Sequence, residues 1–166
     1  MQNVITGKAF VYGPNIDTDQ IYPGRYLDLT DPDKVAEHAM EGADPAFVKE
    51  VKAGDIIVAA ANFGCGSSRE HAAVTLKTVG VGAILADSFG RIFYRNAINL
   101  GVPLLVCPGI AAMVKRGDAV KVELASGKVT NETTGATAQA QALSGYVMDI
   151  LASGGIKPMI KAEYGQ

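Results

Sequence analysis

The sequence DIIVAAANFGCGSSREHAAVTLKTVGVGAILAD, residues 55–87, carries the strongest structural signal in the chain. It begins with a continuous apolar run, which is typical of a strand buried on both faces of a sheet. A glycine-rich turn follows, then a helical stretch closed by Gly80, and then a second apolar run over 82–87. This order predicts a right-handed strand–helix–strand crossover within a parallel sheet.

The pattern continues beyond Asp87. Residues 88–101 predict a helix with Ser88 as its cap and Gly101 as its stop, and residues 102–108 predict a third buried strand. After these elements the pattern changes to an alternation of apolar and polar residues around Ser126-Gly127, which is a hairpin signal. A last short helix is expected over 144–155.

The N-terminal third predicts a strand, a loop and short helices. Residues 8–13 read as a short strand, and residues 15–32, rich in Asp and turn formers, as an extended loop of functional interest. Asp31-Pro32 and Asp44-Pro45 each place a capping residue before a proline, so short helices are expected at 32–40 and after Asp44.

Together these elements predict an α/β fold: a parallel core sheet with flanking helices and an antiparallel C-terminal extension. There is no internal repeat, low-complexity tract or flexible linker, so residues 1–166 are expected to form a single domain. With 48% apolar and 19% charged residues, the chain has enough apolar material for a core without disulfides or a structural metal.

Charge and composition restrict the kinds of partner and the cellular location that we expect for this chain. The net charge is −2 and no Lys/Arg run occurs, so nucleic acid and anionic membrane are not expected as partners. No apolar stretch approaches the roughly 20 residues of a bilayer span, and the N-terminus does not resemble a signal peptide. The two isolated cysteines, Cys65 and Cys107, indicate a reducing, cytoplasmic location.

The turn at 62–72, NFGCGSSREHA, is the first candidate site. Gly64 and Gly66 allow the backbone to turn sharply between strand and helix, and Ser67 followed by Glu70 fits a capping box. Such a helix start presents free backbone N–H groups and the positive end of the helix dipole, which suits a carboxylate or phosphate.

Two further side chains of the turn favour a small anion. Arg69 offers a planar fork for a carboxylate and Ser68 a hydroxyl beside it. The glycine spacing matches neither the Walker A loop nor the dinucleotide fingerprint, and His71 lies too close in sequence to Ser67 for a hydrolase triad. A purely structural turn explains the pattern equally well.

The loop segment NIDTDQIYPGR, residues 15–25, is the second candidate. Asp17 and Asp19 lie close together with Arg25 behind them, although Asx-turns and solvation also explain these aspartates. We expect His71 to be a packing or hydrogen-bonding residue. Arg91 and Arg95, spaced i and i+4, are expected to make surface or interdomain ion pairs, or to face an anion.

Three segments together resemble one family: NIDTDQI…PGRYLDLTDP, GDIIVAAANFGCGSSREHA and SFGRIFYRNAINLGVPLL. In order and spacing, from Lys8 to Leu105, they are similar to the small subunits of 3-isopropylmalate dehydratases, related to the swivelling C-terminal domain of aconitases. The resemblance implies a swivelling β/β/α domain that closes over a separate large subunit. That partner holds a [4Fe–4S] cluster, so no metal ligand and no cofactor is expected in this chain, which has too few cysteines for a cluster.

The resemblance also implies roles for single residues. Ser67 matches the base that removes the carbon-bound proton as an alkoxide, and Asp19 matches an aspartate that pairs with a histidine across the interface. Ser68 and Arg69, with Gly66, match the part of the turn that binds a substrate carboxylate, and Arg25 lies where a second substrate-binding arginine is expected.

The same resemblance places substrate choice in the stretch YLDLT, which comprises Tyr26, Leu27, Asp28, Leu29 and Thr30. It contains no arginine for an extra carboxylate, and its two leucines offer apolar surface, which favours the isopropyl group of isopropylmalate, a small hydroxy acid. Three hypotheses follow: a 3-isopropylmalate dehydratase small subunit in leucine biosynthesis; the same subunit of a homoaconitase or dimethylmalate dehydratase; or a non-catalytic module that binds small anions.

Overall fold

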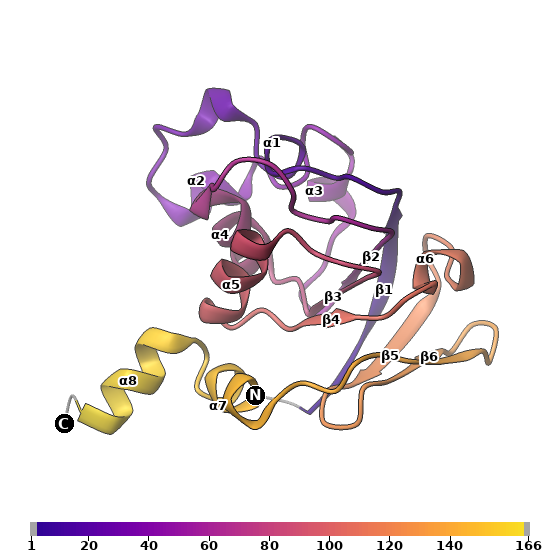
Figure 1. Ribbon diagram of the computed structural model, residues 1–166. Helices are drawn as coiled ribbons and strands as arrows, with labels where there is room; N and C mark the ends of the chain where they lie inside the picture. The colour runs from indigo at the N-terminus through magenta and orange to yellow at the C-terminus, as the bar shows by residue number, and fades with distance from the viewer. Residues whose placement is uncertain (1–2, 165–166) are drawn as a thin grey trace.

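The computed structural model describes residues 3–164, which form one curled seven-stranded sheet with helices packed on it (Figure 1). The sheet order is β4-β3-β2-β1-β5-β6-β7. Strands β1 to β4 are parallel, and β5 to β7 continue from β1 as antiparallel strands. The strands are β1 (Val4–Tyr12), β2 (Ile56–Ala59), β3 (Ala83–Ala86), β4 (Leu104–Val106), β5 (Ala119–Glu123), β6 (Lys128–Asn131) and β7 (Thr137–Gln139). The predicted mixed α/β class is confirmed, and the single-domain organisation stays a prediction.

Strand β1 joins the two kinds of sheet. Its C-terminal half, Ala9–Tyr12, pairs in parallel with β2, whereas Val4–Lys8 pairs antiparallel with β5. A side chain at Gly7 would overlap the Gly54 carbonyl oxygen, so the crossing of the chains here requires glycine. The strand expected at 8–13 was therefore too short at its start. The first half of β1 contains a glycine among partly exposed residues, so it lacks the apolar pattern that indicates a buried strand.

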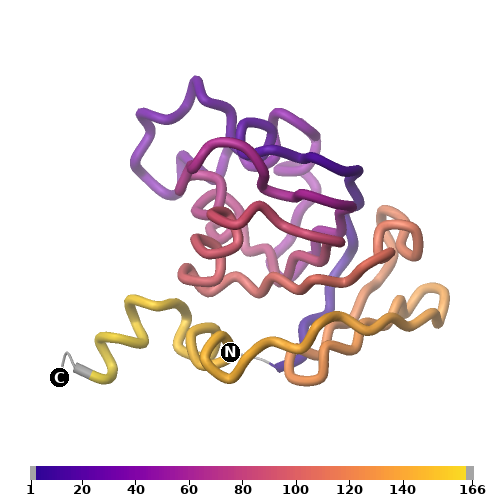
Figure 2. Tube along the Cα trace, viewed as in Figure 1, coloured from indigo at the N-terminus to yellow at the C-terminus, as the bar shows by residue number. Residues whose placement is uncertain are grey.

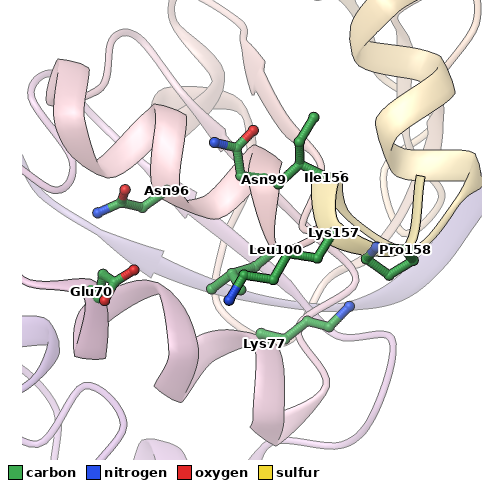
Figure 3. A pocket seen from close by; sticks show the side chains of 9 residues that line it. Glu70, Lys77, Asn96, Asn99, Leu100, Ile156, Lys157 and Pro158 are labelled. Carbon is green, nitrogen blue, oxygen red and sulfur yellow. The ribbon is translucent and has the colours of Figure 1, made fainter. Parts of the chain in front are cut away.

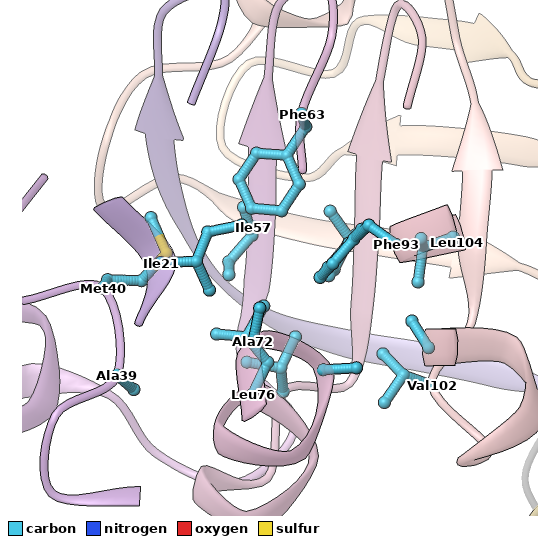
Figure 4. Close-up of a cluster of buried hydrophobic side chains, with 14 of the residues drawn as sticks. Ile21, Ala39, Met40, Ile57, Phe63, Ala72, Leu76, Phe93, Val102 and Leu104 are labelled. Carbon is cyan, nitrogen blue, oxygen red and sulfur yellow. The ribbon is translucent and has the colours of Figure 1, made fainter. Parts of the chain in front are cut away.

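Two hydrophobic cores lie on opposite faces of the parallel strands. Alternate residues of β2 point to different cores: Ile57 packs in the core under α4 and α5, and Ile56 and Val58 pack in the core toward β5 and β6. Figure 4 shows the first core, where Phe63, Leu76 and others meet above the strands. Burial on both faces is the physical reason for the continuous apolar runs.

Eight helices and one 3-10 turn surround the sheet in the described residues 3–164. They are α1 (Thr18–Ile21), the 3-10 turn (Gly24–Tyr26), α2 (Pro32–Ala36), α3 (Phe47–Glu50), α4 (Glu70–Val79), α5 (Arg91–Asn99), α6 (Ile110–Met113), α7 (Gly145–Ala152) and α8 (Ile156–Tyr164). None of them is long and apolar enough to cross a membrane. The trace in Figure 2 shows α8 leading the C-terminal end away from the sheet.

Several predicted helix caps were right. Asp31 caps α2 by accepting a hydrogen bond from the Asp33 N–H, and Ser144 caps α7 by accepting from Val147. Gly80 ends α4 in the left-handed conformation. The helix expected at 32–40 ends earlier, at Ala36, because the chain continues in turns up to residue 43.

Three predicted caps were wrong. Helix α4 begins at Glu70 with Arg69 as its N-cap and no side-chain cap, so Ser67 and Glu70 form no capping box. Helix α5 begins after Gly90, and the Ser88 hydroxyl instead accepts a hydrogen bond from the Asn62 N–H at 2.9 Å. Asp44 is not the N-cap of α3, which begins after Ala46. The Asp44 carboxylate accepts a hydrogen bond from the Ala46 N–H, but it also accepts from the distant Tyr12 hydroxyl and pairs with Arg116.

Other elements were missed. Helix α1 and the 3-10 turn lie inside the segment expected to be an extended loop, and α6, β7 and α8 were not expected at all. These are short or follow a glycine pair, so their apolar periodicity is too brief to detect. The hairpin of β5 and β6 around Ser126-Gly127 is confirmed.

Candidate active site

The turn between β2 and α4 is built by backbone geometry. Gly64 and Gly66 have φ of 83° and 97°, in the region that favours glycine. A side chain at Gly64 would also overlap the ring of Phe93 on α5, so this glycine lets the turn pack directly on that helix. The backbone N–H of Phe63 and the carbonyl of Phe63 further join the turn to Ser88 and Gly90.

The two candidate segments of the sequence, the turn at 62–72 and the loop at 15–25, form one unit. Gly64 N–H donates to the Ile16 carbonyl at 2.7 Å, and Thr18 N–H donates to the Cys65 carbonyl at 2.9 Å. The Thr18 hydroxyl then donates to the Ser67 carbonyl at 2.9 Å, across 49 positions of sequence. The position of Ser67 is therefore set by the 16–18 segment rather than by a helix cap.

Asp17 stabilises the start of α1. Its carboxylate accepts from the Gln20 N–H at 2.8 Å, and the Gln20 side chain accepts from the Asp17 N–H at 3.0 Å. The capping box of this region is thus at the start of α1. The local explanation considered for Asp17 from sequence is confirmed.

Asp19 and Arg69 form an ion pair at the surface of the unit. Arg69 Nη1 lies 2.7 Å from Asp19 Oδ1 and 3.3 Å from the Tyr22 carbonyl oxygen. The Gly24 N–H donates to the same Oδ1 at 2.9 Å. The hydrogen bond from Arg69, and then that from Gly24, lower the pKa of Asp19 below its ordinary value. Arg69 is 19% exposed, whereas Asp19 is 65% exposed, so the pair holds the guanidinium while leaving the carboxylate open to solvent.

Ser67 and its neighbours are accessible to a ligand. Gly66, Ser67 and Ser68 are all exposed, and neither serine hydroxyl has a hydrogen-bond partner within the described residues 3–164. On one side, Ser67 and Gly66 line a pocket of about 230 Å³. Its opposite wall is the start of α5 and includes Arg91, for which an ion pair or a position facing an anion was expected from the sequence.

Arg25 points elsewhere. It pairs with Glu41 at 2.8 Å, lies 4.8 Å over the ring of Tyr26 and is 67% exposed. Glu41 is also 3.0 Å from His38, whose ring stacks on Tyr26 at 3.6 Å. The structure therefore bonds Asp19 to Arg69, whereas Arg25 is bonded to Glu41 and reaches Asp19 only through the attraction between their charges.

The 26–30 stretch is partly core and partly surface. Leu27 is 39% exposed, and Asp28 and Thr30 are also exposed. Leu29 packs against the first core, and its carbonyl oxygen lies 3.0 Å from His71 Nε2. Only one of the two leucines thus offers open apolar surface. His71 also stacks on Tyr22, so its expected packing and hydrogen-bonding role is confirmed.

A larger pocket, of about 380 Å³, lies between α4, α5 and α8 (Figure 3). Glu70, Lys77 and Lys157 are among its lining residues, and none of the predicted site residues reaches it. Over residues 3–164, no group of three or more His, Cys, Asp or Glu side chains is arranged to hold a metal ion. Cys65 and Cys107 are free thiols in different surroundings, the turn and the second core.

Comparisons with known proteins agree with this geometry. The model of the aconitase C-terminal domain matches residues 12–107, which hold the turn, the 15–32 segment and α5. The chain belongs to the aconitase C-terminal-domain family. The family resemblance inferred from the three sequence segments is thereby confirmed.

Members of this family align with the chain along its length. The 3-isopropylmalate dehydratase small subunit 1 of Methanopyrus kandleri is 53% identical, with 98% of this chain and 96% of the relative covered. The 2,3-dimethylmalate dehydratase small subunit of Eubacterium barkeri is 49% identical, with 94% and 96% covered. The crystal structure of 3-isopropylmalate dehydratase from Methanocaldococcus jannaschii superposes with a TM-score of 0.92 at 42% identity, covering 96% of this chain and 95% of that one.

Proposed function

We propose that this chain is the small subunit of a heteromeric [4Fe–4S] hydro-lyase. Assembled with a large subunit, it interconverts 2-isopropylmalate and 3-isopropylmalate by dehydration and rehydration in leucine biosynthesis. One observation carries the proposal: Ser67 and Ser68, whose exposed hydroxyls have no hydrogen-bond partner among residues 3–164, lie beside Arg69, whose guanidinium is bonded to Asp19. They do so in a chain that is 53% identical over nearly its whole length to a 3-isopropylmalate dehydratase small subunit.

Arg69, Ser68 and the backbone at Gly66 are proposed to bind one substrate carboxylate. The Asp19 contact leaves Arg69 with unused N–H donors, and a guanidinium fork suits the two oxygens of a carboxylate. Because Arg69 is mostly buried and oriented before the ligand arrives, binding costs little further side-chain entropy.

Ser67 is proposed to act as the base. Its hydroxyl, once deprotonated, takes the proton from the carbon next to the carboxylate. The C–H bond breaks, an O–H bond forms on Ser67, and the electron pair left on carbon forms the C=C bond as the substrate hydroxyl group leaves. A serine alkoxide needs positive surroundings, and the start of α4 together with Arg69 provides them. The same serine returns the proton to the neighbouring carbon during rehydration.

Asp19 is proposed to act at the subunit interface, and Arg25 is proposed to be a second substrate-binding arginine. In the described part of the chain only Oδ1 of Asp19 accepts hydrogen bonds, so Oδ2 is available to a histidine of the large subunit. Arg25 would first leave Glu41, which costs at most about 1 kcal/mol because exposed ion pairs are weak.

The stretch Tyr26, Leu27, Asp28, Leu29 and Thr30 is proposed to read the substituent of the substrate. Leu27 is its exposed apolar side chain, which supports an alkyl group over a further carboxylate. The relative that acts on 2,3-dimethylmalate keeps that substrate as a second candidate.

The residues of this chain do not fit a cluster. Cys107 is buried in the second core and Cys65 lies in the turn, so the two thiols do not converge on one site. We therefore assign the [4Fe–4S] cluster to the large subunit, and binding, orientation and proton transfer to this chain. A cytoplasmic location is part of the proposal, since free thiols persist in a reducing compartment.

Reconstitution tests the proposal. The purified chain is mixed anaerobically with the cluster-bearing large subunit of the same source, and hydro-lyase turnover is followed with isopropylmalate, dimethylmalate, homocitrate and citrate. Activity of the mixture alone, highest with isopropylmalate, is the expected result. Turnover only with another substrate would replace isopropylmalate. No assembly and no turnover, with tight carboxylate binding by the isolated chain, would instead support the small-anion module.

A further inference from the structure

A second surface adjoins the Ser67 pocket. Arg91 lines this pocket and also lines a groove of about 260 Å³ between α5 and α7. The groove continues along α5 past Arg95 to Tyr146 on α7. Because one side chain belongs to both hollows, the candidate active site and the groove form one continuous surface.

The side chains of this surface have the composition of an interface. Ile92 and Tyr146 are 48% and 63% exposed, which makes them two of the five large apolar side chains on the described surface. Apolar and aromatic anchors flanked by arginine are typical of the centres of protein interfaces. The apolar side chains of Val147 and Ile150 also line the groove.

The two arginines of this surface lack partners. Arg91 and Arg95 lie one turn apart on α5 and are exposed, and neither makes an ion pair or hydrogen bond within the described chain. The surface ion pairs expected for them from the sequence are thus not formed among residues 3–164, and the other two expectations, an interdomain ion pair or a facing anion, stay predictions. Two adjacent unpaired guanidinium groups favour an acidic surface on whatever covers them.

We propose that this α5–α7 face, defined by Arg91, Ile92, Arg95 and Tyr146, is the docking surface for the cluster-bearing large subunit. The inference rests on the proposed function. A substrate held at Ser67 must touch both subunits at once, so the large subunit must approach to within the length of a small hydroxy acid. The surface bordering the Ser67 pocket is then covered, and the partner is expected to present carboxylates opposite Arg91 and Arg95.

The test compares Arg95→Glu and Tyr146→Ala with the wild-type chain. Both residues are exposed and lie outside the Ser67 pocket, and Lys128→Glu, an exposed charge reversal on β6, is the matched control. The dissociation constant for the large subunit is measured by titration, along with turnover at saturating large subunit. Each variant is expected to raise the dissociation constant about 10-fold, the scale of a moderate interface contact. Turnover at saturation should match wild type, and Lys128→Glu should change neither quantity.

Salt provides a second readout. The wild-type association is expected to weaken as ionic strength rises, and Arg95→Glu should reduce that dependence. Unchanged dissociation constants in both variants, in a mixture that assembles and turns over, would overturn the docking surface while leaving the proposed function intact. Altered self-association of the isolated chain with unchanged affinity for the large subunit would also overturn it, and would identify a contact between copies. If wild-type subunits neither assemble nor turn over, both proposals fail.

Discussion

The two sides of the turn between β2 and α4 differ in how their arginines are partnered. On the side of the 15–30 segment, Arg69 is held by Asp19 and by the Tyr22 carbonyl oxygen. On the α5 side, Arg91 and Arg95 have no partner within residues 3–164. A guanidinium oriented by its own chain is ready for a small ligand, whereas an unpaired one stays hydrated until another surface reaches it. Ser67 lies between the two.

The largest expected effect is on Ser67 itself. Replacing Ser67 by Ala should lower kcat of the reconstituted enzyme by about 10²–10⁴-fold, the usual contribution of a general base. The free energy of unfolding should change by less than about 0.5 kcal/mol, because within residues 3–164 Ser67 is hydrogen-bonded through its carbonyl and not through its hydroxyl. Steady-state kinetics and urea unfolding measure the two quantities, with Ser153→Ala as control. Substantial turnover of the Ser67→Ala variant would contradict the assignment of Ser67 as the base.

Gly64 lies in the turn between β2 and α4 and packs directly on Phe93 of α5, so it connects the turn to the α5 side. Gly64→Ala should destabilise the chain by about 3 kcal/mol, from overlap with the ring and a positive φ together. Gly135→Ala is the matched control: its φ is 84°, but no atom lies within 4 Å of the added carbon. That variant should lose only about 1 kcal/mol. Equal losses in urea unfolding would show that contact with α5 contributes nothing to the turn.

The two arginines of the 15–30 side should differ from each other. Arg69→Lys is expected to raise KM about 10-fold, because an ammonium cannot hold Asp19 and a carboxylate in one plane. Arg25→Lys should raise KM by no more than about 2-fold, since the pair with Glu41 is exposed and either cation can make it. If Arg25→Lys raised KM more than Arg69→Lys, Arg25 and not Arg69 would be the more important arginine for substrate binding.

The smallest effect concerns pH. The pKa of Asp19 is lower in the folded chain than its ordinary value of 3.8, chiefly because of Arg69. The stability that this depression contributes is therefore complete above that ordinary value, and is lost as pH falls through the folded pKa. Asp19→Asn should make unfolding free energy fall less steeply below about pH 4. Arg95→Gln, on the unpaired side, should leave the pH dependence unchanged. Urea unfolding from pH 5 to pH 2 distinguishes the two, and identical slopes for Asp19→Asn and wild type would contradict the pairing.

Local patterns predicted the framework well. The apolar runs of β2, β3 and β4 and the helix between the first two are visible because burial on both faces demands them. Asp31, Ser144 and Gly80 were found as helix ends because a cap acts within a few residues. The exceptions were Ser67, Ser88 and Asp44. Each fits the local pattern of a helix cap. The side chains of Ser88 and Asp44, however, form hydrogen bonds with residues far away in the sequence, and so does the backbone carbonyl of Ser67.

The sequence by itself determined the α/β class, the buried parallel strands, the turn of small and polar residues and the family, because these depend on periodicity and on motifs within one segment. Only the tertiary structure decided that β1 divides its pairing between β2 and β5, and that the 16–18 segment holds Ser67. It likewise paired Arg69 with Asp19 while leaving Arg91 and Arg95 unpaired. Those outcomes depend on contacts between residues dozens of positions apart, whose formation depends on the packing of the whole sheet and not on local propensity.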